Sequence, residues 1–109
     1  MTWAMDELES RAASQLGRLH DFSDGLRRIS VRESSTDDLI TVEVDGNGAM
    51  TGLWLGSGAN ELGATALGET IVATATRAAQ RAFARRAALT EDFADSFAEL
   101  VQSRPDDWG

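Results

Sequence analysis

Residues 39–55 read LITVEVDGNGAMTGLWL, and this stretch decides the fold. Apolar and polar side chains alternate from Ile40 to Val44, the pattern of a β-strand with one buried face. The next residues, Asp45 to Gly48, contain Asp-Gly and Asn-Gly, the strongest short-range signals for a hairpin. Another apolar segment runs from Met50 to Leu55. The stretch predicts antiparallel strands over about 39–45 and 49–55, joined by a tight turn.

A third strand is predicted just upstream. Ile29 and Val31 alternate with polar neighbours, and a polar break from Ser34 to Asp38 separates them from Ile40. The interpretation is a strand over about 29–34 that joins the other two in an antiparallel meander. Such a sheet has one face to bury and two edges whose backbone groups lack a neighbour.

The N-terminal segment predicts a long helix, because its apolar residues recur three and four apart. The positions of this seam are Met5, Leu8, Ala12, Gln15, Leu19, Phe22, Leu26 and Ile29. A helix of about 25 residues is about 37 Å long, which exceeds the diameter of a compact domain of this size. We therefore expect it either to project or to lie against a second chain, with Leu8, Leu19, Leu26, Ile40 and Val42 as candidate residues of a homodimer interface.

After Gly56-Ser57-Gly58 the chain becomes alanine-rich, and helical spacing predicts a second long helix over about 64–88. Thr90-Glu91-Asp92 has the pattern of a new N-cap, which predicts a short extra C-terminal helix that carries Phe93 and Phe97. The predicted class is α+β, of the order α-β-β-β-α with that extra helix. We expect one domain over 1–102 and a frayed tail over 103–109.

The composition excludes several kinds of chemistry. The chain has no cysteine, no lysine and a single histidine, His20. Disulfides, thiolate catalysis, a Walker A loop and Schiff-base mechanisms are therefore excluded, and a transition-metal site is not expected. The glycine pairs at 46–48 and 56–58 fit a hairpin and a helix entry, because a dinucleotide-binding fingerprint needs a parallel βαβ unit and these strands are predicted to form consecutive hairpins. We expect no enzyme activity, no metal and no cofactor.

The location of the protein is predicted from its apolar runs and its N-terminal residues. No apolar run approaches the roughly 20 residues of a membrane helix, and the N-terminal residues are acidic rather than basic. We expect a cytoplasmic protein with no membrane partner.

Charge is distributed unevenly. The net charge is −8, yet no acidic residue lies between Glu69 and Glu91, a segment that carries four arginines. Steps of four place Arg77, Arg81 and Arg85 on one helical face, about 12 Å long. Candidate contacts to DNA phosphates are Arg77, Arg81, Arg85, Arg86, Arg27 and Arg28. The alternative is that these arginines pair with acidic residues of the chain itself, such as Glu91 and Asp92.

The order of these segments resembles the YbaB/EbfC family of bacterial nucleoid-associated proteins. The matching stretches are 26–31 (LRRISV), 39–48 (LITVEVDGNG) and 50–55 (MTGLWL), followed by the alanine-rich helix after Gly63. The chain is also similar to actinobacterial, EspL-like members of the family that are encoded beside type VII secretion systems.

The resemblance implies an intertwined homodimer whose sheets pair and whose helices project. It also implies a nucleoid-associated protein that binds double-stranded DNA without sequence preference. The alternative function is a protein-interaction module, a chaperone or regulator, associated with type VII secretion. The acidic segment 91–107 departs from a DNA-binding pattern.

Overall fold

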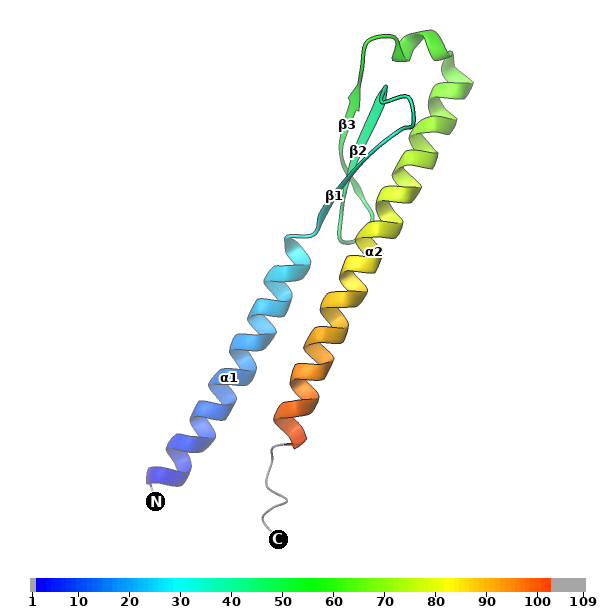
Figure 1. Cartoon of the computed structure of the whole chain (residues 1–109). Coiled ribbons are helices and arrows are strands. Elements are labelled where there is room, and N and C mark those ends of the chain that lie inside the picture. Colours follow the sequence, from blue (N-terminus) through cyan, green and yellow to red (C-terminus); the bar gives the residue numbers. More distant parts are fainter. Residues whose placement is uncertain (1, 103–109) are drawn as a thin grey trace. The chain divides into compact units, whose positions relative to one another are not determined.

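The computed structural model describes residues 2–102 and consists of two long helices and a small sheet (Figure 1). The elements in chain order are α1 (Thr2–Arg27), β1 (Ser30–Ser34), β2 (Ile40–Asp45), β3 (Met50–Leu55), the 3₁₀ helix η1 (Ala59–Leu62) and α2 (Ala64–Gln102). The predicted tail, 103–109, lies outside the described residues. The α+β class and the order of helix, three strands and helix are confirmed.

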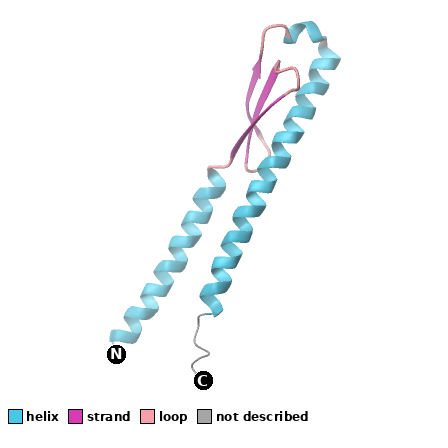
Figure 2. Ribbon diagram, in the orientation of Figure 1, coloured by secondary structure: helices cyan, strands magenta, loops and turns pink. Residues whose placement is uncertain are grey.

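The three strands form one antiparallel sheet in the order β1-β2-β3, so the predicted meander is also confirmed (Figure 2). The Asp45 carboxylate closes the β2–β3 hairpin by accepting the backbone N–H groups of Asn47, at 2.9 Å, and Ala49, at 3.1 Å. Gly48 has a φ of 79°, a left-handed conformation that favours glycine. The turn chemistry read from the sequence therefore fixes the register of the hairpin.

The core is the inner face of β2. Ile40, Val42 and Val44 are each fully buried, and on α2 Ala78 and Ala82 are fully buried as well. Because alanine is small, it leaves room between the helix and the sheet for the branched side chains of β2. Thr74, also fully buried, satisfies its hydroxyl by donating to the carbonyl of Thr70 at 2.8 Å. The core thus holds no buried side-chain N or O without a partner among the described residues.

The chain divides into two compact units that share α2, and the single domain over 1–102 stays a prediction. The sheet unit is residues 27–87, with the three strands and the first part of α2. The helical unit, in its described part, is residues 2–26 and 88–102. Among the described residues, the buried apolar side chains of the core all lie in the sheet unit, so the main core belongs to that unit alone.

The two segments of the helical unit pack through aromatic rings. Phe22 stacks on Phe93 with ring centroids 4.6 Å apart, and Phe93 lies 6.1 Å from Phe97. A Cβ on Gly25 would lie 3.4 Å from the Leu89 side chain, so glycine permits close contact here. The two segments run antiparallel, and their contacts place Phe22 of the predicted seam against the last part of α2.

The short extra C-terminal helix was a wrong prediction, because α2 is one helix from Ala64 to Gln102. Thr90 lies inside it rather than at an N-cap. No proline or glycine lies between Gly68 and the end of α2, so nothing in the backbone stops it. Threonine is compatible with the interior of this helix: Thr70, Thr74 and Thr76 each donate to the carbonyl four residues before.

The packing of α2 on the sheet can be tested by overfilling a buried position. Ala82→Leu adds a branched side chain at a fully buried position, so it should lower the free energy of unfolding by about 1–3 kcal/mol. Ala84→Leu, at an exposed position of the same helix, should change it by less than about 0.5 kcal/mol. Urea denaturation followed by circular dichroism measures both; equal effects would contradict the proposed packing.

Candidate interaction site

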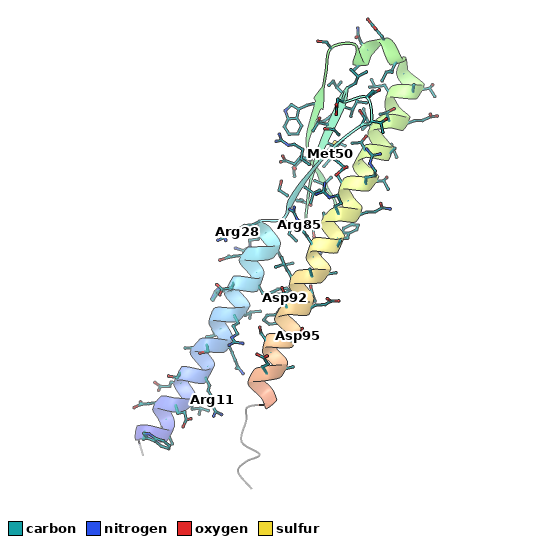
Figure 3. All side chains as sticks on the ribbon, in the orientation of Figure 1. Arg11, Arg28, Met50, Arg85, Asp92 and Asp95 are labelled. Carbon is teal, nitrogen blue, oxygen red and sulfur yellow. The ribbon has the colours of Figure 1, made fainter. Side chains whose placement is uncertain are left out.

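The arginines of the predicted stripe lie along β1, the strand at one edge of the sheet. We call Arg77, Arg81 and Arg85 the arginine row. Arg77 donates to the carbonyl of Ser34 at 2.9 Å and Arg85 donates to the carbonyl of Ser30 at 3.0 Å. Arg85 is seen between α2 and the strands in Figure 3. Between them, Arg81 forms an ion pair with Glu33, whose other oxygen is 3.8 Å from the Arg77 guanidinium.

The spacing of helix and strand explains this arrangement. Arg77 and Arg85 are two helical turns apart, about 12 Å along α2. Ser30 and Ser34 are four residues apart on β1, about 13 Å along an extended strand. The spacing of Arg77 and Arg85 along α2 therefore matches the spacing of Ser30 and Ser34 along β1. The row supplies donors to carbonyls on the unpaired edge of β1, and so protects this edge from pairing with another strand.

The arginine row keeps part of its surface in solvent. The side chains of Arg77 and Arg81 are 43% and 57% exposed, so their guanidinium groups are shared between the sheet and water. The acidic partner observed for them is Glu33 on β1, so these two arginines do pair within the chain, as the alternative predicted, but with an acid other than Glu91 and Asp92. Sequence spacing along α2 identified the row but did not reveal that β1 lies beside it.

The other candidate arginines occupy separate places in the sheet unit. Arg86 contacts the β2–β3 turn, where its Nη1 is 3.1 Å from the Asn47 side-chain oxygen and 3.4 Å from the Gly46 carbonyl. Arg27 and Arg28 are exposed at the start of this unit. Arg86 therefore also contributes to holding α2 against the sheet.

At the opposite edge of the sheet, β3 is left uncovered. Its side chains Met50, Leu53 and Leu55 lie opposite Val44, Val42 and Ile40 in the β2–β3 pairing, and directly opposed residues share a face. The three β2 residues are fully buried, but the three on β3 are 45%, 41% and 51% exposed. The arginine row contacts β1, so α2 lies toward that side and leaves the inner face of β3 in solvent.

The uncovered side of β3 continues onto α2. Phe83 is 48% exposed, and its ring lies beside the β2–β3 turn, 2.7 Å from where a Cβ on Gly48 would be. We define the β3 face as Met50, Leu53, Leu55 and Phe83. It combines exposed apolar side chains with the unpaired backbone of an edge strand, the combination that most favours association with another chain.

The outer face of the sheet carries a charged and aromatic cluster. Arg32 forms an ion pair with Glu43 at 2.8 Å, and its guanidinium carbon lies 4.3 Å from the centre of the Trp54 ring. The hydrogen bond from Arg32 holds the pKa of Glu43 below its usual range. A Cβ on Gly52 would lie 2.5 Å from the Trp54 ring, so glycine is needed beneath it. This cluster joins all three strands on the side away from α2.

The predicted dimer-interface residues fall into two groups. Leu8 and Leu19 are 64% and 49% exposed on α1, and Leu26 is half-buried. Ile40 and Val42 are fully buried within a single chain, so they belong to its own core rather than to an exposed surface. Their alternation on β2 correctly indicated a buried face, but the element that covers it is α2.

Two further polar residues lie outside these clusters. Asp37 accepts hydrogen bonds from the Ser35 hydroxyl at 2.6 Å and the Leu39 backbone at 3.1 Å, which lower its pKa and order the β1–β2 turn. His20 is exposed on α1. Within residues 2–102 no group of three or more metal-ligating side chains is present. No helix over the same residues is long and apolar enough to cross a membrane.

Two parts of the site were missed at the level of sequence. Glu33 was not singled out, because its role depends on the packing of α2 beside β1. Met50, Leu53 and Leu55 were assigned to a strand without being recognised as exposed. The sequence did carry a sign of this exposure, because β3 has more apolar residues than a strand with one buried face requires.

Comparison with known proteins supports the fold and no more. No family model matches the sequence, and none of the curated proteins compared with it is significantly similar. Among solved structures, the chain is similar to the uncharacterized protein HP0035 from Helicobacter pylori, with a TM-score of 0.63 and 11% identity. That similarity covers 82% of this chain and 95% of the other. Identity this low shows a shared fold, and the resemblance to the YbaB/EbfC family stays a prediction from sequence.

The Arg32–Glu43 pair predicts a pH-dependent stability. The folded pKa of Glu43 is depressed, so its contribution is present above the unfolded pKa of about 4.3 and is lost as the pH falls through the lower folded value. The wild type should melt at a higher temperature than Glu43→Gln near pH 7, and the difference should shrink below about pH 4. When Arg32 is replaced by Met in both proteins, the difference in melting temperature that Glu43→Gln causes should be smaller at all pH values. A difference independent of pH would contradict this account.

Proposed function

We propose that the protein is a non-enzymatic homodimer that acts as an interaction module, assembled through the β3 face. The observation that carries the proposal is the exposure of Met50, Leu53 and Leu55 beside an unpaired strand edge. A soluble monomer rarely leaves an apolar strand of this kind open, because it invites pairing with another chain.

A second copy is a suitable occupant of the β3 face. Pairing of β3 with β3 of another copy about a two-fold axis would satisfy the free backbone groups and extend each sheet from three strands to six. The sheet unit has seven acidic and seven basic residues, so two copies meet without net charge repulsion. The arginine row protects β1, which leaves β3 as the edge available for pairing.

The second candidate function is DNA binding, in which the arginine row would contact the DNA phosphates. Nucleoid association would be its consequence. DNA binding is favoured by the row's partial exposure and by the absence of acidic residues from 70 to 90. A dimer would present two such rows. Glu33 competes for the same arginines, so phosphate would have to displace it or share the guanidinium groups. The secretion-linked role of the interaction module rests on the resemblance alone.

The dimer proposal predicts a mass near twice 11.7 kDa at micromolar concentration, measured by light scattering. Leu53→Asp places a charge in the β3 face, where it would be desolvated without a partner, so it should shift the mass toward the monomer. Leu53 is 41% exposed in one chain, so the variant should still fold. Leu16→Asp, an exposed leucine of α1, serves as the matched control and should leave the mass unchanged. A wild-type monomer under these conditions would overturn the proposal.

The DNA candidate predicts opposite effects of two substitutions. Arg81→Ala should weaken binding similarly for unrelated duplexes and make the salt slope shallower by about 0.9 for each phosphate that the variant no longer neutralises. Glu33→Gln removes the competing charge, so it should strengthen binding. Fluorescence anisotropy with two unrelated duplexes at ~50 and ~150 mM salt measures both effects. Failure of the wild type to bind at ~50 mM salt, where electrostatic affinity is strong, would exclude this candidate and leave the dimer proposal intact.

A further inference from the structure

The net charge of the protein is concentrated in the helical unit. The described segments 2–26 and 88–102 carry nine acidic residues and two arginines, a net charge of −7. The sheet unit, by contrast, has equal numbers of acidic and basic residues. The two units therefore differ in the partners that electrostatics allows them.

The helical unit also leaves apolar side chains in solvent. Residues 3–21 of α1 are all exposed, and packing against α2 begins to cover the helix only from Phe22 onward. We call Met5, Leu8, Leu16 and Leu19 the α1 apolar row; they are 61%, 64%, 58% and 49% exposed. The row extends over about 21 Å of helix. An isolated amphipathic helix gains most of its stability from covering such a row.

Helical geometry places the row beside the contact with α2 rather than within it. At roughly 100° per residue, the row lies about 40° to 120° around α1 from Phe22. Asp21 lies on the other side of Phe22, where a groove of about 250 Å³ is lined by Asp21 and Asp92. Because the segments are antiparallel, Phe97 falls on the same side as the apolar row, and it is 47% exposed. The row and Phe97 form one apolar surface along the pair.

An acidic border lies on the α1 side of this surface. On α1, Glu9 lies roughly 20° beyond Leu16 around the helix. On α2, Glu91 and Asp95 are exposed on the far side of the helix, roughly 120° and 160° around it from Phe97, and add to the negative charge of the unit (Asp95 is labelled in Figure 3). The groove on the opposite side is a weaker candidate for a partner, because Arg18 lines it and donates to the Ser96 carbonyl at 3.2 Å.

We propose that the α1 apolar row and Phe97 bind a basic amphipathic helix of another protein. Leucine-like residues of the partner would pack on the row, and its lysine or arginine side chains would face the acidic border. Charge decides against a second copy of the helical unit, which would bring another seven negative charges to the contact. For the same reason the surface repels nucleic acid and anionic lipid. The proposal is independent of the β3 dimer, which involves the sheet unit.

The test uses the full-length chain and two labelled peptides of about 20 residues, long enough to span the row. Both carry leucine at the same helical positions; one has lysine and the other glutamate at the flanking positions. Fluorescence anisotropy should detect binding of the basic peptide and not of the acidic one. Raising the salt from ~50 to ~500 mM should weaken binding of the basic peptide by about tenfold, because exposed ion pairs are screened.

Two variants of α1 separate apolar docking from simple charge attraction. Leu8→Asp and Ala13→Asp each add one negative charge to an exposed position, but Ala13 lies outside the row, about 60° beyond Leu16 around the helix. Charge alone predicts that both would tighten binding of a basic peptide. The proposal predicts that Leu8→Asp weakens it about tenfold or more, whereas Ala13→Asp retains it or tightens it.

Three outcomes of the peptide experiments would overturn the proposal. These are binding of neither peptide, equal binding of both, and equal effects of Leu8→Asp and Ala13→Asp. Light scattering on Leu8→Asp gives an independent readout. A shift of that variant to monomer would assign the row to a second copy, whereas an unchanged mass agrees with a different partner. Circular dichroism confirms that each variant is folded, and failure of the β3 dimer is measured separately on Leu53→Asp.

Discussion

The packing of α2 on the inner face of β2 is the interaction on which the rest of the structure depends. Burying Ile40, Val42 and Val44 contributes about 1.5–3 kcal/mol for each side chain. That gain requires a helix with small residues at the contact, which Ala78 and Ala82 supply. A domain this small has little other apolar surface to bury, so the position of α2 over β2 determines which remaining surfaces are left open.

Where α2 lies across the sheet determines the two edges. The arginine row binds carbonyls of β1, and this holds the helix toward that strand. One set of contacts thereby protects one edge and exposes the other, with Leu53 and Leu55 uncovered on β3. The same arginines that a phosphate-binding role would use are the groups that hold the helix in place. A phosphate-binding role would therefore compete with the structural role of the row.

The two units divide the charge as well as the packing. The sheet unit is electrically balanced and carries an open strand edge, which suits self-association. The helical unit carries the acidic excess and an exposed apolar row, which suits a basic partner. Under the two proposals, one unit would serve self-assembly and the other would recruit a partner, and the continuous α2 joins them.

The sequence by itself determined the elements, since strand alternation, the Asp-Gly-Asn-Gly turn and the helical periodicities are local signals. It placed each strand within a residue of its observed start and identified the arginine row on one helical face. It did not determine that α2 continues through Thr90, that Ile40 and Val42 are covered by α2, or that Glu33 is the acidic partner of the row. Those outcomes depend on which segments distant in sequence pack together. Only the tertiary structure decided that α2 lies toward β1 and leaves β3 open, because this choice arises from contacts between residues more than 40 positions apart.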